Sequence, residues 1–194
     1  AEQHTEKVLR TAKALGVRYY RMNYFRYDLS KPIWPQLESW KPQLKELVAL
    51  SKEIGIQPLY QNHSGKTNAG APIWDVYTLM REYAPTELAF AFDIMHATVE
   101  GSESWPLEVS LVRDYLGVAY FKNFSFGDGK HATCPLADGV VKKDYVALLK
   151  KLGWSGPCSL HIEYLKGKVN DPGYLEEAIK ATKTDFATLK EWWS

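Results

Sequence analysis

The sequence has few cysteines, almost no net charge and no long hydrophobic segment. Cys134 and Cys158 are too few for a disulfide framework and are not spaced like a metal-binding pair. The net charge of +1 argues against the concentrated basic surface that nucleic acid requires. No segment has the length of a bilayer-spanning helix, and no signal-like stretch opens the chain. We therefore expect neither nucleic acid nor a membrane as a partner, and the compartment, cytoplasmic or periplasmic, stays open.

The composition is that of a protein with a substantial core. Hydrophobic residues make up 45% of the 194 residues, which is enough for one domain over residues 1–194. Seven tryptophans and twelve tyrosines are many for this length. Aromatic rings stack on sugars, but they more commonly fill cores, so their number alone does not indicate a ligand.

Four segments repeat one form, in which a helical stretch is followed by a glycine and then by an apolar strand. The four glycines are Gly16, Gly55, Gly117 and Gly153. Glycine past the last helical turn can adopt the left-handed conformation that ends a helix. The repeat predicts an opening helix and then five strand–helix units. The expected strands lie near 17–23, 56–62, 88–94, 117–123 and 157–163, and the expected helices that follow them near 36–54, 73–83, 105–115, 142–152 and 173–192.

Alternating strands and helices predict a parallel sheet with right-handed crossovers. No glycine-rich phosphate loop follows the first strand, which argues against the nucleotide-binding form of such a sheet. The strand near 88–94 is apolar almost throughout and ends at Asp93, a carboxylate that a metal ion, a cation or a polar substrate would have to compensate. We expect a loop after Asp93, from which His96 reaches the same place. The alternative is an aspartate that caps this loop and a histidine on the surface.

Polar residues stand at the carboxyl ends of four expected strands. Because side chains alternate along a strand, residues two apart share a face. On one face the strands end in His63, Asp93, Lys122 and Glu163, whereas the opposite faces are mostly large and apolar. Lys122 could instead extend its ammonium to solvent, and His161, one layer deeper, could be a hydrogen-bonded core residue. The convergence of four strands is typical of the catalytic rim of an α/β barrel.

Five motifs stand in a characteristic order along the chain: 61–65 (QNHSG), 92–101 (FDIMHATVEG), 120–124 (YFKNF), 135–141 (PLADGVV) and 159–164 (SLHIEY). In that order they resemble the xylose isomerase-like TIM barrel family, in particular its sugar phosphate isomerase/epimerase branch, with sugar 3-epimerases and, more distantly, endonuclease IV. The resemblance spans nearly the whole chain, and its most specific part is Asp-x-x-His-Ala-x-x-Glu-Gly. It implies a TIM (β/α)8-barrel-like α/β fold, of which the last five units, strands 4 to 8, are present.

The resemblance also implies a divalent metal at the carboxyl end of the barrel, held by Glu, Asp, His and Glu from the last four strands. Asp93 and Glu163 match two of these ligands. His96 resembles the histidine that binds substrate in the epimerases and metal in endonuclease IV. Lys122 resembles the lysine of a His-x-Lys-Asp strand, so the family pattern is retained in part.

Three positions depart from that pattern: Gln61 replaces a Glu, Tyr120 a His, and Asn123 an Asp. Gln61 cannot ionise and therefore cannot act as a base. Two readings of the site stay open. In the first, Asp93 and Glu163, together with His96 or His63, form a rearranged site for a Mn, Mg, Zn, Fe or Co ion. In the second, Lys122 supplies the positive charge and no metal binds.

The expected reaction is proton transfer at a carbon beside the carbonyl of a sugar or sugar phosphate. The expected catalytic residues are Glu163, as the base, and Lys122. The expected substrate-binding residues are His63, His96, Asn62 and Gln61. The alternatives are a keto-polyol dehydratase or lyase step on the same site, and a carbohydrate-binding protein whose metal site is degenerate. An endonuclease IV-like repair enzyme comes last, because the multi-histidine zinc cluster is not reproduced.

Five strands cannot close an eight-stranded barrel, and their open edge would expose backbone hydrogen-bonding groups. We therefore expect the sequence to be part of a longer protein. The alternatives are a partner chain that completes the barrel, or a small open sheet in its own right. The open edge would also allow two copies to pair as a homodimer.

Overall fold

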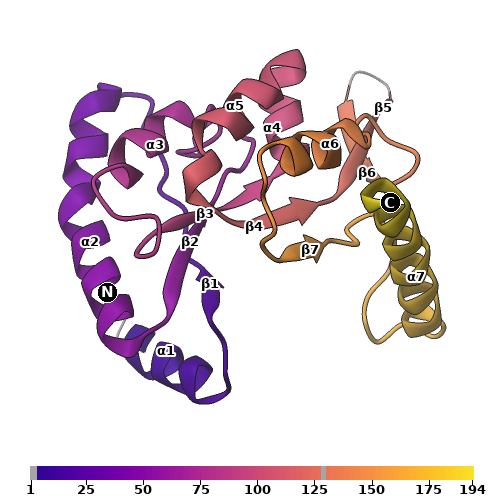
Figure 1. The fold of residues 1–194 in the computed structure, drawn as a ribbon, viewed down its shortest axis with the longest axis horizontal. Coiled ribbons are helices and arrows are strands. Elements are labelled where there is room, and N and C mark those ends of the chain that lie inside the picture. Colours follow the sequence, from indigo (N-terminus) through magenta and orange to yellow (C-terminus); the bar gives the residue numbers. More distant parts are fainter. Residues whose placement is uncertain (1–3, 128–129) are drawn as a thin grey trace.

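A computed structural model describes residues 4–127 and 130–194 (Figure 1). Its centre is a five-stranded parallel sheet whose strands follow one another in chain order. A doubly wound sheet would reverse its order at a switch point, whereas an unbroken order is that of a barrel wall. The fold is thus a parallel half-barrel of the TIM-barrel type. Its strands are β1 (Tyr19–Arg21), β2 (Gln57–Gln61), β3 (Ala89–Asp93), β4 (Leu116–Phe121) and β7 (Cys158–Leu160).

Helices connect these strands, and Figure 1 shows α2, α3, α5 and α6 along one side of the sheet, as in the outer layer of a barrel. No helix in the described part of the chain is long and apolar enough to cross a membrane. The α-helices are α1 (Thr5–Ala14), α2 (Ile33–Ile54), α3 (Trp74–Met80), α4 (Ile94–Gly101), α5 (Trp105–Leu111), α6 (Asp144–Lys151) and α7 (Tyr174–Trp193), and two short 3-10 turns are η1 (Ser102–Ser104) and η2 (Arg113–Tyr115).

The glycine repeat has two different physical causes. Gly55 ends α2 in the left-handed conformation, at φ 77°, as predicted. Gly117 does not end a helix, and that prediction is wrong, because it lies inside β4. A Cβ at Gly117 would stand 2.7 Å from Cδ2 of Leu59, a residue of β2. Glycine is therefore required there by close packing rather than by backbone conformation.

Two further segments differ from the sequence-based expectation. The expected loop after Asp93 is the helix α4, whose first turn begins at once. The expected strand near 117–123 ends early, and an antiparallel hairpin of β5 (Asn123–Gly127) and β6 (Lys130–Cys134) follows. The buried Asn123 side chain holds the base of this hairpin, since its amide nitrogen donates to the carbonyl oxygens of Leu136 and Val141, both at 2.8 Å.

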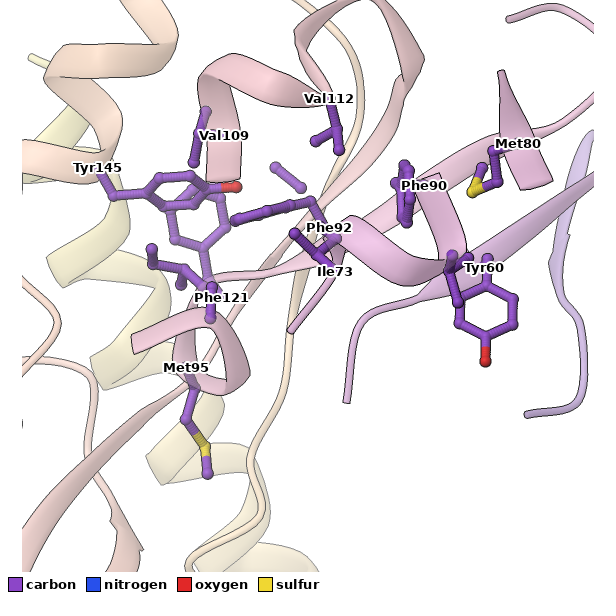
Figure 2. Close-up of a cluster of buried hydrophobic side chains, with 14 of the residues drawn as sticks. Tyr60, Ile73, Met80, Phe90, Phe92, Met95, Val109, Val112, Phe121 and Tyr145 are labelled. Atoms are coloured by element: carbon purple, nitrogen blue, oxygen red, sulfur yellow. The ribbon is translucent and has the colours of Figure 1, made fainter. Parts of the chain in front are cut away.

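The two faces of the sheet have different side chains, as their alternation predicts. Phe90, Phe92 and Phe121 are fully buried on the helix-covered face, where Figure 2 shows them with Tyr145 and Val109 from the helices. The inner face carries a separate small cluster formed by Leu59, Ala89, Ala91 and Val118 with Tyr120 beside it. The aromatic layer therefore supplies the core. The inner face carries mostly small side chains up to the carboxyl ends of the strands.

The aromatic layer predicts a matched pair of stability effects. Phe121→Ala should lower the free energy of unfolding by about 3–5 kcal/mol, because the ring is fully buried and lies 5.1 Å from the Tyr145 ring between centroids. Phe126→Ala, at a side chain that is 70% exposed, should cost about 1 kcal/mol or less. Urea unfolding of both variants measures the difference. Equal losses would contradict this assignment of the core.

A second buried group predicts a pH effect. Glu108 on α5 is buried, and its Oε2 atom has no hydrogen-bond partner among the described residues. Burial, assisted by the negative charge of Glu100, raises the pKa of Glu108 from 4.5 to about 7. Between these values the folded chain binds a proton that the unfolded chain releases. Stability must therefore fall as the pH rises through this range.

Glu108→Gln keeps the shape of the side chain and removes its titration. We expect the variant to be more stable than the wild type at about pH 8 and to lose the decline between about pH 5 and pH 8. The matched control is Glu103→Gln at an exposed position in η1, five residues before Glu108, which should retain the wild-type profile. Urea midpoints across the pH range provide the measurement, and an unchanged decline in Glu108→Gln would contradict the assignment.

Candidate functional site

The carboxyl ends of four neighbouring strands bring the predicted polar residues together. Gln61 ends β2, Asp93 ends β3, Lys122 follows β4, and Glu163 lies three residues beyond β7. Parallel pairing aligns these ends, since Gln61 pairs with Ala91 and Asp93 lies two residues further along the neighbouring strand. Of the four residues predicted to converge, Asp93, Lys122 and Glu163 lie together, whereas His63 packs against His96 and Gln61 contacts Asp93.

Asp93 is the centre of this cluster and is 0% exposed. Its Oδ1 atom accepts the backbone N–H groups of Met95 and His96, at 3.1 and 3.3 Å, and so caps α4. Its Oδ2 atom accepts from Nε2 of Gln61 at 2.7 Å and lies 3.2 Å from Nζ of Lys122. Asp93 therefore does act as a cap, as the alternative interpretation predicts, but it caps a helix and not a loop. The same carboxylate also forms an ion pair with Lys122.

The backbone of Asp93 is fixed separately by Asn62. The Asn62 side chain accepts from the Asp93 N–H at 2.7 Å and donates to the Asp93 carbonyl at 3.0 Å. Burial raises the pKa of the Asp93 carboxyl, and the nearby Lys122 ammonium and the Gln61 amide oppose that rise. A carboxylate in this position therefore depends on its ion pair and its hydrogen bonds.

Lys122 links the two carboxylates. Its Nζ atom lies 3.1 and 3.3 Å from the carboxylate oxygens of Glu163 as well as 3.2 Å from Asp93. The residue is only 4% exposed, so its ammonium does not extend into solvent from the rim. Glu163 is half-exposed, and the His161 ring beside it, followed by Lys122, lowers the pKa of Glu163 to about 2. A carboxylate of this kind is ionised at neutral pH.

His161 is hydrogen-bonded, as its simpler explanation predicts. Its Nε2 atom lies 3.0 Å from Oγ of Ser159, and its Nδ1 atom lies 3.5 Å from the Glu163 carboxylate. The ring also packs on Tyr120, with 4.3 Å between centroids. His161 therefore positions Glu163 from below the rim.

Two histidine rings pack against each other at the end of β2 and the start of α4, with 33° between their planes. The rings of His63 and His96 are 3.7 Å apart between centroids. His96 is buried, contrary to the alternative that placed it on the surface. Its Nδ1 atom lies 2.8 Å from Oγ of Ser64, whereas its Nε2 atom has no hydrogen-bond partner in the described part of the chain and lies 3.7 Å from Oδ2 of Asp93. Burial and the Lys122 charge lower the pKa of His96 to about 2, so the ring is neutral.

Sequence reasoning assigned no role to two residues of the site, Tyr24 and Ser64. The Tyr24 hydroxyl donates to Oε1 of Gln61 at 2.6 Å, which turns the amide nitrogen of Gln61 toward Asp93. Tyr24 lies three residues beyond β1, so the rule used for the other strand ends would have found it. Ser64 lies inside the 61–65 motif, but its contact with the distant His96 is not visible in the sequence.

The donor set does not fit a divalent metal ion. Asp93, Glu163 and His96 were expected as ligands, but the ammonium of Lys122 lies between the two carboxylates. Gln61 presents nitrogen rather than oxygen to this point. Within residues 4–127 and 130–194, no three His, Cys, Asp or Glu side chains form a group that could hold a metal ion.

Comparison with known proteins identifies the fold. The family model described as xylose isomerase-like TIM barrel matches residues 2–185. No curated protein sequence matches the chain. A D-tagatose 3-epimerase-like protein superposes with a TM-score of 0.69 at 16% identity, over 96% of this chain and 66% of that one. A xylose isomerase domain protein from Planctomyces limnophilus does so with a TM-score of 0.74 at 15% identity, over 96% and 64%.

A third similar structure is the IolI protein with a bound zinc atom, with a TM-score of 0.73 at 16% identity. The superposition covers 97% of this chain and 67% of the IolI chain. The chain spans just under two thirds of the length of the first two structures. At these identities the likeness concerns the fold and not the activity.

The contact between Ser64 and His96 predicts one tautomer. A neutral imidazole carries a single N–H, and the Asp93 oxygen near Nε2 favours the proton there, so Nδ1 accepts from the Ser64 hydroxyl. Nitrogen-15 NMR of the His96 ring should show the Nε2–H form in the wild type. Ser64→Ala should shift the balance toward Nδ1–H, and Ser64→Thr should restore it. An Nδ1–H tautomer in the wild type would overturn the assignment.

Proposed function

The chain belongs to the xylose isomerase-like TIM barrel family, and from this premise we propose that it transfers a proton at a carbon beside the carbonyl group of a sugar. One observation carries the proposal: a buried ammonium lies between two carboxylates at the carboxyl ends of parallel strands. That edge is where catalytic groups of α/β barrels act. In this assignment β1, β2, β3, β4 and β7 correspond to strands 4 to 8 of a full barrel.

Glu163 is the base. It is ionised and half-exposed, so a substrate carbon can approach it. With a pKa near 2 it would be a weak base, because His161 and Lys122 stabilise its charge. A substrate oxygen that takes over the hydrogen bonds of Lys122 removes part of this stabilisation. The basicity of Glu163 then rises at the moment when the substrate is in place.

Lys122 is the group that stabilises the developing charge. As Glu163 takes the proton from carbon, the electron pair moves to the carbonyl oxygen, and an N–H of Lys122 donates to that oxygen. Return of the proton by Glu163 to the former carbonyl carbon, while the proton of the adjacent hydroxyl moves to the former carbonyl oxygen, gives an isomer. Return of a proton to the original carbon from the opposite face gives an epimer and requires a second proton donor on that face. Asp93 holds Lys122 at this point through its Oδ2 atom, 3.2 Å away.

The remaining predicted residues divide into two groups. His63 and His96 are assigned to the substrate in this proposal, supported by the partly exposed ring of His63 and by the packing of the His96 ring against it. Asn62 and Gln61 are buried and hydrogen-bonded to Asp93. We therefore assign them the positioning of Asp93 rather than direct substrate binding.

A carbohydrate-binding protein without turnover is the second candidate. It is favoured by the neutral side chains of Gln61 and Tyr120 and by the low pKa of Glu163, which make the cluster a better binding surface than a base. Binding by hydrogen bonds and ring stacking would need no change of protonation. The two candidates therefore differ in whether a carbon-bound proton exchanges with solvent.

Deuterium exchange separates them. The chain is incubated in D2O with a panel of ketoses, aldoses and their phosphates, and NMR follows label at the carbon beside the carbonyl. We expect exchange in the wild type, with a loss of roughly 10²–10⁴-fold in Glu163→Gln and in Lys122→Met. Glu176→Gln, at an exposed position of α7, is the matched control and should be unaffected.

Two results would change the conclusion. Full exchange in Glu163→Gln would show that another group is the base. Sugar binding in calorimetry, without exchange for any member of the panel, would favour the binding protein.

A further inference from the structure

The cation of the site is already part of the chain. Lys122 follows β4, and its ammonium is held by a carboxylate at the end of β3 and by another beyond β7. All three contacts, one to Asp93 and two to Glu163, lie between 3.1 and 3.3 Å, and Lys122 is 4% exposed. An ammonium removed from water needs such partners, so its position is determined by both carboxylates.

The oxygens that a metal ion would use are engaged by nitrogen donors. On Asp93, Oδ1 accepts two backbone N–H groups of α4, and Oδ2 accepts from Gln61 and faces Lys122. A divalent ion between Asp93 and Glu163 would stand against the Lys122 ammonium. Two positive charges at that separation repel strongly in a buried site, so the ammonium would have to leave first.

Gln61 strengthens the exclusion of a metal. Its Oε1 atom, the only atom of the side chain that could ligate, accepts a hydrogen bond of 2.6 Å from the Tyr24 hydroxyl. The amide group therefore directs its N–H toward Asp93. To offer oxygen to a metal, Gln61 would have to turn over and break both hydrogen bonds.

We propose that the Lys122 ammonium takes the place of a divalent metal ion between Asp93 and Glu163, and that the chain works without metal at this site. The inference deepens the proposed function, because it names the group that polarises the carbonyl oxygen. It rests on that function for its chemical meaning, but metal binding can be measured without any turnover.

The experiment is a titration with Mn²⁺, followed by the electron paramagnetic resonance signal of the free ion. We expect no Asp93-dependent site in the wild-type chain. Lys122→Met removes the charge and keeps most of the volume, so it should bind Mn²⁺ at least about tenfold more tightly than the wild type. The double variant Lys122→Met with Asp93→Asn should lose this gain. Lys151→Met, at an exposed position, is the matched control and should bind as the wild type does.

Two outcomes would overturn the inference. One is a stoichiometric Mn²⁺ site in the wild type that Asp93→Asn abolishes. The other is a folded Lys122→Met variant that binds Mn²⁺ no better than the wild type, and Lys122→Gln replaces it if circular dichroism shows that the methionine variant is unfolded. Failure of the proposed function would appear elsewhere, as absence of deuterium exchange, whereas exchange that survives a chelator would agree with the inference.

Discussion

The burial of the Asp93 carboxylate is the constraint on which the rest of the site depends. A carboxylate that is 0% exposed must be neutralised or fully hydrogen-bonded, or it destabilises the fold. Here the amides of α4, the Gln61 side chain and the Lys122 ammonium share that task, and Asn62 fixes the backbone. The same requirement therefore starts a helix, orients an amide and buries a lysine.

The sheet supports this arrangement through the unequal size of its two faces. Phe90 and Phe92 point to the helices and make the core, whereas Ala89 and Ala91 line the inner face. Gly117 has no side chain, so β4 can pack closely against Leu59 and Ala89 of the inner face. Stability is therefore concentrated on the helix side, and the carboxyl edge of the inner face is left to polar groups. A charged cluster is tolerated there because the buried aromatic layer supplies most of the stability of the fold.

The parts of the prediction that failed are those in which a side chain changes the path of the backbone. The loop expected after Asp93 is a helix because that carboxylate caps it by accepting two backbone N–H groups of its first turn. The strand expected to reach Asn123 turns into a hairpin because the Asn123 amide bonds to carbonyls more than ten residues ahead. Gly117 was predicted to end a helix. Close packing and the left-handed conformation of a helix end both require glycine, and a single sequence does not distinguish the two.

The sequence by itself determined the five strands of the parallel sheet, the alternation of their faces and the identity of most residues at their carboxyl ends, but not the β5–β6 hairpin. These follow from local periodicity, which a strand has wherever it is placed. Only the tertiary structure decided that the Lys122 ammonium stands between Asp93 and Glu163, and that Tyr24 turns Gln61 toward the same point. Those contacts join residues about thirty to forty positions apart. Which cation compensates a buried carboxylate is set by the distances between strands, and no local pattern contains them.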